Sequence, residues 1–172
     1  MLEIQLTQGK ITQIDDIDFD LMNFNWCALK GGTKCLPRWY AMRAGPKING
    51  KRTPNIYIHR VVLERKIKRP LKNTEMVDHI DHDGLNNCRD NLRLATCQQN
   101  LQNRRKNPSK SSKYKGVIWD KNRQKWIARL VVNGISIYLG RFDNETEAAK
   151  QYDNAARETF GEFCCMNFKR DD

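Results

Sequence analysis

The segment 77–102 constrains the fold of this chain more than any other part of the sequence, because turn-forming residues separate two short β-prone runs in it. The first run, residues 76–79, ends in a cluster rich in Asp, Gly and Asn, which favours a loop. The second run, residues 92–95, alternates apolar and polar residues, and Thr96 suits the N-cap of a following helix. The sequence therefore predicts a strand, a loop, a second strand and a helix that reaches about Arg105.

Three side chains of this segment have complementary chemistry. A helix laid across the hairpin can bring Asn100 beside Asp78 and His79. A carboxylate and a carboxamide supply oxygen ligands, which suit a hard cation such as Mg²⁺ or Mn²⁺. The imidazole of His79, with an ordinary pKa near ~6.5, then remains to take a proton from an attacking water. We therefore predict a catalytic set of His79, Asp78 and Asn100, in which Asp78 and Asn100 bind the metal and His79 is the general base.

The order of these residues, DH followed by NN, NLR and a further Asn, resembles the HNH endonucleases of phages and intron homing enzymes. The resemblance implies that His79 occupies the first position of the motif, Asn91 the middle one and Asn100 the last, where many relatives carry His. It implies a structural role for Asn91, whose amide both donates and accepts and so holds the loop against the hairpin backbone. A lone Asp-His pair or an Asn-rich loop is usually structural, but this combination favours a nuclease.

The charge of the chain favours a polyanionic partner. Its 172 residues include 31 Lys and Arg against 20 Asp and Glu, which gives a net charge of +11 and a pI of about 9.5. Double-stranded DNA is the expected partner, and RNA is a weaker candidate because the β-rich part lacks the aromatic pattern of RNA-binding sheets. No apolar run reaches the ~18 residues of a membrane span, so we expect no membrane partner. We expect a monomer on DNA in the cytoplasm, which is the host cytoplasm if a phage encodes the protein.

The six cysteines do not predict a disulfide framework. They show no C-x-x-C spacing, and the adjacent Cys164 and Cys165 suit neither a zinc corner nor an ordinary disulfide. We expect reduced thiols and no zinc. The alternative is a structural zinc site, as in some HNH relatives, although the spacings do not fit one. Its ligands would be Cys27, Cys35, Cys88 and Cys97.

Residues 1–75 predict a small, mostly β scaffold with a short helix. The acidic run 15–22 can start a helix, because carboxylates complement the helix dipole, and its charge argues that it faces away from DNA. His59 stands at an element boundary, where a structural hydrogen bond is a better interpretation than catalysis. His82 lies in a solvated turn, where an accessory substrate contact is the alternative to no role.

A basic stretch follows the predicted nuclease module. Residues 106–113 contain Ser and Pro and no apolar period, which is typical of a linker. Positive side chains on a flexible segment can follow a phosphate backbone and release counterions, and the alternative is a solvated spacer. The residues expected to contact DNA here are Arg104, Arg105, Lys106, Lys110, Lys113 and Lys115.

From Tyr114 onward the pattern predicts a three-stranded antiparallel sheet with one helix. Three β-rich runs are separated by residues 121–123 and by Asn133-Gly134, a strong hairpin signal. Residues 144–147 predict a capping box, and apolar residues follow it at helical spacing. Alternation then gives the sheet one face under the helix and one free face. The residues expected to face the helix are Trp126, Ala128 and Leu130, and those expected to face outward are Lys125, Ile127 and Arg129.

The runs KYKGV, KW, LGRF and EAAKQYDNAA, with a closing MNF, resemble the Apetala-type DNA-binding domain of plant ethylene response factors, also found fused to phage HNH endonucleases. The resemblance implies that the free face of the sheet lies in the major groove. Four positions depart from the plant contacts, which excludes the plant target sequence; they are Ile118, Asp120, Val131 and Ser136. Trp119 and Trp126 fit the core better than base stacking. The residues expected to contact DNA from this domain are Lys115, Lys121, Arg123, Lys125, Arg129, Tyr138 and Arg141.

These patterns predict an α+β fold, in which a β-rich N-terminal scaffold leads into a ββα-metal module. The expected limits are 1–105 for scaffold and nuclease, with the HNH core at about 57–105, then 106–113 for the linker and 114–168 for the DNA-binding domain. The leading hypothesis is a site-directed, homing-type DNA endonuclease, encoded by a phage or mobile element, that hydrolyses a phosphodiester bond with one divalent metal. The alternative is a DNA-binding regulatory or architectural protein with an inactive HNH module.

Overall fold

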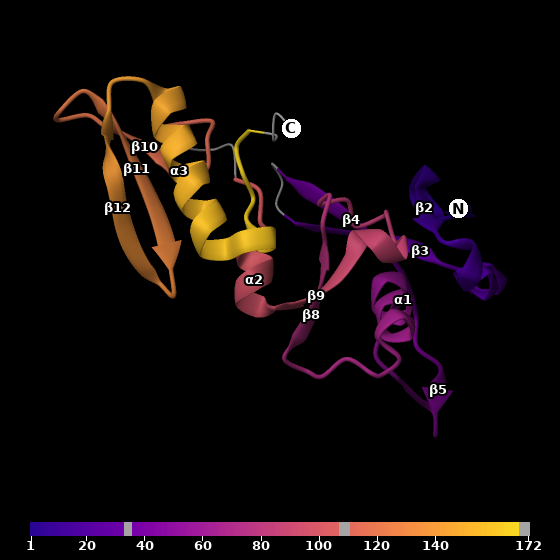
Figure 1. The fold of residues 1–172 in the computed structure, drawn as a ribbon. Coiled ribbons are helices and arrows are strands. Elements are labelled where there is room, and N and C mark those ends of the chain that lie inside the picture. Colours follow the sequence, from indigo (N-terminus) through magenta and orange to yellow (C-terminus); the bar gives the residue numbers. More distant parts are fainter. Residues whose placement is uncertain (33–35, 107–110, 169–172) are drawn as a thin grey trace. The chain divides into compact units, whose positions relative to one another are not determined.

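The computed structural model describes residues 1–32, 36–106 and 111–168, and the chain divides into two compact units. The first unit is Met1–Cys97 and the second is Gln98–Asp172. Both units combine helices with small antiparallel sheets, so the predicted α+β class is confirmed (Figure 1). The predicted domain limits at residues 105, 113 and 168 concern functional modules and stay predictions.

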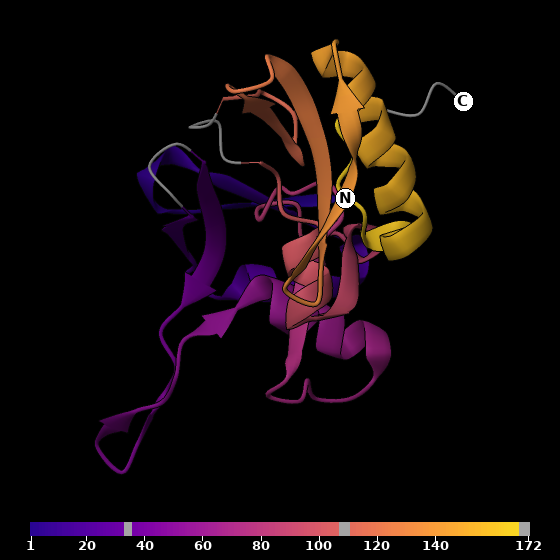
Figure 2. The same ribbon diagram turned by 90° about the vertical axis from the view of Figure 1, so that its left-hand side faces the viewer.

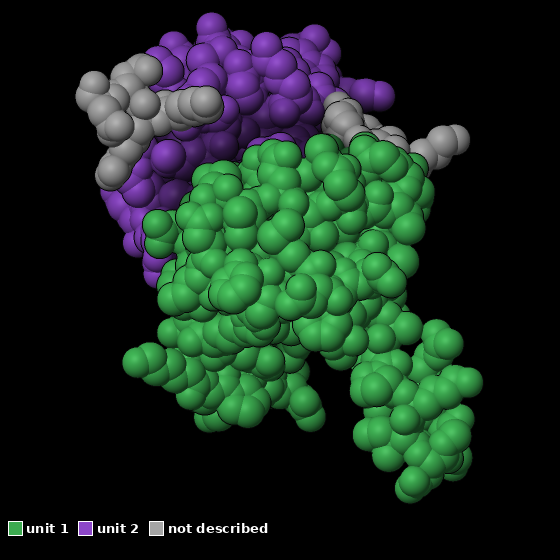
Figure 3. All heavy atoms as spheres, turned by 90° about the vertical axis from the view of Figure 1, so that its right-hand side faces the viewer, with its two compact units in different colours: residues 1–97 green, residues 98–172 purple. Residues whose placement is uncertain are grey.

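The first unit is built from short elements. In chain order they are β1 (Leu2–Gln5), η1 (Thr7–Gly9), β2 (Ile11–Ile14), η2 (Asp16–Asn23), β3 (Cys27–Gly32), β4 (Pro37–Arg43), β5 (Lys47–Ile48), β6 (Lys51–Arg52), β7 (Ile56–Tyr57), α1 (Ile58–Ile67), β8 (Glu75–His79), η3 (Arg89–Asn91) and β9 (Leu92–Thr96). The strands form four antiparallel sheets, β1–β2, β3–β4–β7, β5–β6 and β8–β9. The β5–β6 hairpin projects from the rest of this unit as an arm (Figures 2 and 3).

One apolar core holds the first unit together. α1 contributes Ile58, Val62 and Leu63, which are buried and recur at helical spacing. They belong to one cluster with Ile14 of β2 and Leu92 of β9. The core therefore joins the N-terminal strands to the β8–β9 hairpin, and the predicted mostly β scaffold with a short helix is confirmed.

The predicted order of strand, loop, strand and helix is confirmed for residues 77–102. β8 and β9 pair in antiparallel register, both lie against α1, and α2 (Cys97–Gln102) follows β9 directly (Figure 1). The helix is shorter than predicted and does not reach Arg105. At its end, Nζ of Lys115 donates to the carbonyl oxygen of Gln102, the last helical residue, and to that of Arg104 beyond it. The ββα-metal arrangement itself stays a prediction.

The second unit is a three-stranded sheet covered by one helix, as predicted. After α2 its elements are β10 (Val117–Asp120), β11 (Lys125–Val132), β12 (Ile135–Phe142), α3 (Glu145–Phe160) and η4 (Gly161–Phe163). The strands pair antiparallel in the order β10–β11–β12, and the register shifts between Ala128 and Arg129. Asn144 caps α3, because its side chain accepts a hydrogen bond from the backbone nitrogen of Thr146 at 2.7 Å.

Small residues let α3 approach the sheet closely. Ala148 and Ala149 on α3 and Ala128 on β11 are fully buried in one cluster. Gly116 has a φ of +75°, and a Cβ there would lie 1.9 Å from Cδ2 of Tyr152, so only glycine fits. The predicted helix-facing residues Trp126, Ala128 and Leu130 all pack in the cores beneath α3.

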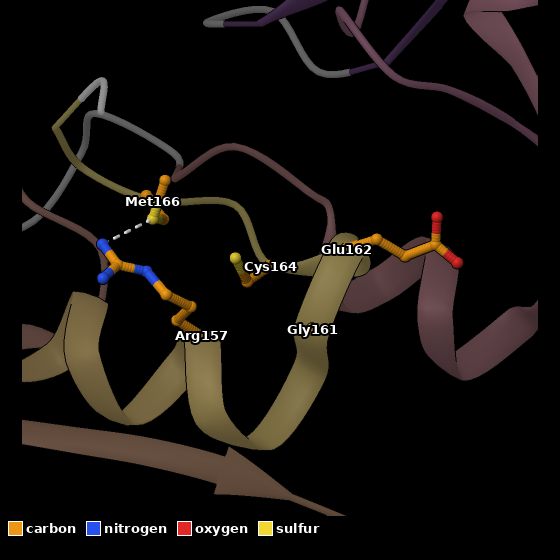
Figure 4. Close-up of a pocket in the computed structure, with 5 residues that line it drawn as sticks. All are labelled: Arg157, Gly161, Glu162, Cys164 and Met166. Atoms are coloured by element: carbon orange, nitrogen blue, oxygen red, sulfur yellow. Dashed lines mark hydrogen bonds between the residues drawn. The ribbon is translucent and has the colours of Figure 1, made fainter. Parts of the chain in front are cut away.

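The segment after η4 is fastened to the rest of the second unit. The backbone nitrogen of Asn167 donates to both carboxylate oxygens of Asp153 at 2.9 Å, and its side chain bonds to the backbone nitrogen and oxygen of Lys115. The closing MNF run thus ties the end of the unit to the segment that precedes β10. A pocket of about 370 Å³ lies next to this run. Two of its lining residues are joined by a hydrogen bond, which Arg157 donates to the sulfur of Met166 (Figure 4). The pocket is lined by Arg157, Gly161, Glu162, Cys164 and Met166.

Candidate active site

Asp78 and His79 lie at the end of β8 and are both buried, with 4% and 8% of their surface exposed. Asp78 is paired across the hairpin with Arg93. Its Oδ2 accepts a hydrogen bond from Nε of Arg93 at 2.8 Å and forms an ion pair with Nη2 at 2.7 Å. Opposite charges directly across a strand pair stabilise each other, and removing one leaves a buried charge. Arg93 was not in the predicted site, although the NLR run contains it.

A chain of hydrogen bonds fixes the ring of His79. The hydroxyl of Thr12 donates to the carbonyl oxygen of Leu85 at 2.7 Å, and Nδ2 of Asn87 donates to that hydroxyl at 2.7 Å. Asn87 therefore turns its amide oxygen toward His79, whose Nε2 lies 3.3 Å away. Because an amide oxygen only accepts, this network assigns the proton to Nε2 and the lone pair to Nδ1.

The imidazole of His79 packs in a cluster of aromatic rings that also contains His59, Tyr40 and Tyr57. The ring centroids of His59 and His79 are 5.4 Å apart in an edge-to-face arrangement. Tyr40 lies 5.6 Å from His59 and 6.2 Å from His79, and Tyr57 stacks on His59 at 5.4 Å. Nδ1 of His59 is buried and has no hydrogen-bond partner among the described residues, so the structural hydrogen bond predicted for this side chain is wrong. His59 is held by ring packing and belongs to the surroundings of His79.

Burial lowers the pKa of both imidazoles. For His79, burial outweighs the hydrogen bond to Asn87 and the nearby carboxylates, and the pKa lies below its ordinary value. For His59, burial is the main cause, and the charges of His79 and Arg60 add to it, so that its pKa falls to about 3. Both rings are therefore neutral near pH ~7, which is the form that a general base needs.

Asn91 joins the two ends of the loop between β8 and β9. Its Nδ2 donates to Oδ1 of Asp81 at 2.9 Å and to the carbonyl oxygen of Asn86 at 2.8 Å, while its Oδ1 accepts from the backbone nitrogen of Asp81 at 3.0 Å. The backbone nitrogen of Ile80 also donates to the carbonyl oxygen of Asn91 at 3.0 Å. This geometry suits the structural role predicted for Asn91.

The N-terminal strands hold the same loop in place. The backbone of Gln13 in β2 accepts from Asn87 at 2.8 Å and donates to Leu85 at 2.9 Å. On the other side, a Cβ at Gly84 would lie 2.3 Å from the carbonyl oxygen of Trp39 and 2.8 Å from the Tyr40 ring. The loop therefore passes β4 so closely that only glycine fits at this position.

Most of the acidic run folds into the 3-10 helix η2, which links α1 to η3 through ion pairs. Asp18 is fully buried and accepts hydrogen bonds from Arg65 on α1 and from Arg89 in η3. Burial raises the pKa of Asp18, but the hydrogen bonds from Arg89 and Arg65 outweigh it and hold the pKa below its ordinary value. Asp20 accepts two further hydrogen bonds from Arg65. That the run faces away from DNA stays a prediction.

The proposed metal ligands differ in how far the structure describes them. Asp78 is placed as above, whereas Asn100 lies on α2 in the second unit, and its proximity to Asp78 and His79 stays a prediction. Within the described residues, no group of three His, Cys, Asp or Glu side chains is arranged to hold a metal ion. The oxygen donors of Asp78 and Asn100 are of the kind that Mg²⁺ or Mn²⁺ takes together with waters and phosphate oxygens. Their chemistry fits such an ion, and Asp78 would share its carboxylate between the metal and Arg93.

The cysteines that the structure describes are free thiols, as predicted. They are Cys27, Cys88, Cys97, Cys164 and Cys165. Cys35, a member of the alternative zinc set, lies outside the described residues. Among the described helices, none combines the length and the apolar character needed to cross a bilayer.

On the free face of the second unit's sheet, some basic side chains are exposed and others form ion pairs. Arg129 and Tyr138 are cross-strand partners, and both are exposed. Arg141 is braced, because its Nε lies 3.5 Å from Oδ2 of Asp120 and its guanidinium lies 5.9 Å from the centre of the Tyr138 ring. Of the other residues predicted to contact DNA, Lys113, Lys121 and Arg123 are exposed and Lys125 forms an ion pair with Asp143 at 2.9 Å.

Two lysines predicted to contact DNA bind backbone oxygens of the second unit. Nζ of Lys106 donates to the carbonyl oxygens of Ser112 and Tyr114. Lys115, whose pKa is lowered by burial, makes the bonds at the end of α2. These bonds join the residues that follow α2 to the residues that precede β10. Arg104 and Arg105 are exposed, and Lys110 lies outside the described residues.

The first unit therefore holds a buried Asp-His pair on a hairpin, and the second unit holds a sheet with basic side chains on its exposed face. Comparison with protein families gives the same two parts. Residues 56–102 match the HNH endonuclease family, and residues 112–162 match the AP2 domain family. Residues 56–102 are therefore similar to HNH endonucleases and residues 112–162 to AP2 domains, and the predicted resemblance to both is confirmed.

The chain is similar to viral and plant proteins. An uncharacterized HNH endonuclease of Acanthamoeba polyphaga mimivirus is 38% identical over 135 residues, which cover 76% of this chain and 66% of the relative. Protein 3.8 of Escherichia phage T7 is 37% identical over 65 residues, or 38% of this chain and 54% of that protein. An AP2/ERF and B3 domain-containing transcription repressor of Arabidopsis thaliana is 43% identical over 59 residues, or 34% of this chain and 16% of the repressor. No solved structure matches the chain significantly.

Proposed function

We propose that this protein is a metal-dependent endonuclease of the homing type that cuts double-stranded DNA at chosen sites. The observation that carries the proposal is the fixed and neutral imidazole of His79 beside the carboxylate of Asp78. The HNH family match and the net charge of +11 support it. The buried ring and the buried carboxylate are adjacent in one strand, which is an arrangement that stability alone does not require.

His79 is the general base in this proposal. Its Nε2 proton points to Asn87, so the lone pair on Nδ1 takes the proton of the water that attacks phosphorus. Asn87 fixes the orientation of the ring, and His59 and Tyr40 pack against it. A positioned base of this kind contributes about 10²–10⁴ in rate.

Asp78 and Asn100 are the proposed ligands of one Mg²⁺ or Mn²⁺ ion, with no zinc required. When bound, such an ion stabilises the negative charge that develops on the phosphate and the leaving oxygen. Asp78 supplies a carboxylate oriented by Arg93, and Asn100 supplies an amide oxygen from α2. Asn91 keeps the loop in place through its bonds to Asp81 and Asn86.

The second unit positions the enzyme on its target in this proposal. Arg129, Tyr138 and Arg141 stand on the free face of the sheet, where side chains can reach base edges in a major groove. The basic residues around it, including Arg104, Arg105 and Lys113, contact phosphates. The protein acts as a monomer on DNA in the cytoplasm.

Incubation with supercoiled plasmid tests the proposal. We expect conversion to nicked or linear DNA with Mg²⁺ or Mn²⁺, and no conversion with EDTA or with the His79→Ala variant. Binding of the plasmid without conversion in either ion rejects the nuclease. That result would support the alternative of a DNA-binding regulatory or architectural protein with an inactive HNH module.

A further inference from the structure

The arm formed by β5 and β6 has no role in the site described above. It is a two-stranded ribbon that extends away from the core of the first unit (Figure 2). Lys47 faces Arg52 and Ile48 faces Lys51 across it, and Asn49-Gly50 forms its tip. All of these residues are exposed, and none belongs to the apolar core. The arm therefore contributes little to the stability of the unit.

The arm is nevertheless built as a defined hairpin. Asn49 and Gly50 have φ angles of 50° and 76°, which is the backbone of a tight two-residue hairpin turn. At the base, the backbone nitrogen and the hydroxyl of Thr53 both donate to the carbonyl oxygen of Pro46 at 2.9 Å. A Cβ at Gly45 would lie 2.2 Å from the carbonyl oxygen of Pro54, so the two strands enter the arm in close contact. These features give the tip and the base of the arm a defined conformation.

The charges of the arm have no counterpart in the chain around them. Lys47, Lys51 and Arg52 form no hydrogen bond or ion pair with any residue that the structure describes. Lys47 and Arg52 are directly opposite each other, and like charges at such positions destabilise a strand pair. In the sequence, residues 21–63 hold eight Lys and Arg and no Asp or Glu. An external polyanion would relieve this repulsion.

We propose that the arm enters a groove of duplex DNA, with Lys47, Lys51 and Arg52 on the flanking phosphates and Ile48 against the base edges. A two-stranded ribbon fits the width of the major groove, and Lys and Arg on both strands can reach the two backbones that border it. Ile48 is 60% exposed next to the tip, where an apolar side chain gains nothing in water but can contact sugars or thymine methyl groups. The proposal rests on the proposed function only in taking DNA as the partner.

A binding titration with the full-length protein tests the arm. Fluorescence anisotropy on a labelled duplex is measured at several salt concentrations in EDTA, so that the result does not depend on cutting. The variant Lys47→Ala/Lys51→Ala/Arg52→Ala is expected to bind more weakly at low salt and to lower the slope of log affinity against log salt by about two to three. Circular dichroism verifies that the fold is retained.

A matched control removes the same charge elsewhere. In Lys68→Asn/Lys72→Ala/Lys150→Ala three exposed lysines outside the arm are replaced, and Asn tolerates the left-handed φ of 57° at position 68. Equal losses in both variants, or no change in the arm variant, overturn the proposal. An equal loss on single-stranded DNA overturns the groove assignment.

Ile48→Ser isolates the apolar contact. We expect a several-fold weaker affinity for the duplex with an unchanged salt slope, since no charge is removed. Unchanged affinity removes Ile48 from the interface. Because all of these readouts concern binding, they stand apart from the plasmid test: a protein that binds through the arm but never cuts rejects the nuclease alone.

Discussion

The two units hold their functional side chains in opposite ways. In the first unit Asp78 and His79 are 4% and 8% exposed, and each is bonded to a specific partner. In the second unit Tyr138 is 59% exposed and stands beside exposed Arg129 on a sheet whose other face is covered by α3. Chemistry requires groups fixed to within a fraction of an ångström, whereas recognition requires groups that can reach a partner.

This difference predicts how strongly the effects of substitutions are coupled within each unit. When one member of a buried pair is removed, the other member stays buried without a partner, which destabilises the fold further. An exposed side chain is lost alone, and its effect adds to those of its neighbours. Changes in the first unit should therefore be large and coupled, and changes in the second unit should be smaller and independent.

The largest expected effect comes from His79→Ala. The rate of plasmid cleavage should fall by a factor of about 10²–10⁴. DNA affinity should stay nearly unchanged, because the neutral imidazole transfers a proton and makes no ionic contact with the DNA phosphates. Single-turnover cleavage and anisotropy on the same duplex measure the two quantities. His82→Asn is the control, since His82 lies in the same loop with a φ of 68° that Asn accepts. Equal rates for both variants would end the assignment of His79 as base.

Breaking the ion pair of Asp78 should have the next largest effect. Arg93→Met leaves the buried carboxylate without its guanidinium and should lower the free energy of unfolding by about 3–5 kcal/mol. Urea unfolding followed by tryptophan fluorescence measures this. The double variant Asp78→Asn/Arg93→Met should recover part of the loss, because no charge is then stranded. A double variant as unstable as the sum of the single variants contradicts the coupling.

The exposed face should give a smaller and separable effect. Arg129→Ala should weaken binding to the preferred sequence by about 1–3 kcal/mol if the side chain reads a base, and should leave unfolding unchanged. Competition between preferred and random duplexes measures the discrimination. Lys150→Ala on α3 removes the same charge from an exposed position outside that face and serves as the control. If both variants weaken all duplexes alike, Arg129 contacts phosphate only.

The smallest expected effect concerns pH. The unfolded chain protonates His59 below its ordinary pKa of ~6.5, whereas the folded ring stays neutral until about pH 3, so stability is lost as pH falls between these values. Between about pH 7.5 and about pH 5.5 the loss from this group should be about 1 kcal/mol. His59→Phe should remove that part of the pH dependence. An unchanged pH profile in the variant would show that His59 already titrates normally in the folded protein.

The sequence predicted most where the signal was local. The turn cluster after residue 79, the alternation in residues 92–95 and the Asn-Gly hairpin at residues 133–134 each depend on neighbouring residues, and all three appear in the structure. The faces of β11 followed from alternation alone. The end of α2 was predicted too late, because the carbonyl oxygen of its last residue, Gln102, accepts a hydrogen bond from Lys115, which lies outside the helix.

The partners of the candidate site could not be predicted in the same way. Thr12 bonds to Asn87 from a strand that lies 75 residues earlier in the sequence, and no spacing rule connects the two residues. Arg93 was visible as a strand residue, but its bond to Asp78 depends on the register of the hairpin. The ring contact between His59 and His79 arises from the packing of α1 on the hairpin, which only the folded core determines.

The hydrogen-bond chain from Leu85 through Thr12 and Asn87 to His79 limits how much of the candidate site could be moved into another protein. The family match begins at residue 56, yet β2 supplies both the hydroxyl and the backbone groups that hold the loop between β8 and β9. A graft of residues 56–102 into another protein would carry the motif but leave its histidine without a fixed tautomer. A transplantable form of the proposed nuclease therefore needs the opening strands of the first unit and Asn100 of α2 as well as the motif, since β2 builds the candidate site as much as the motif does.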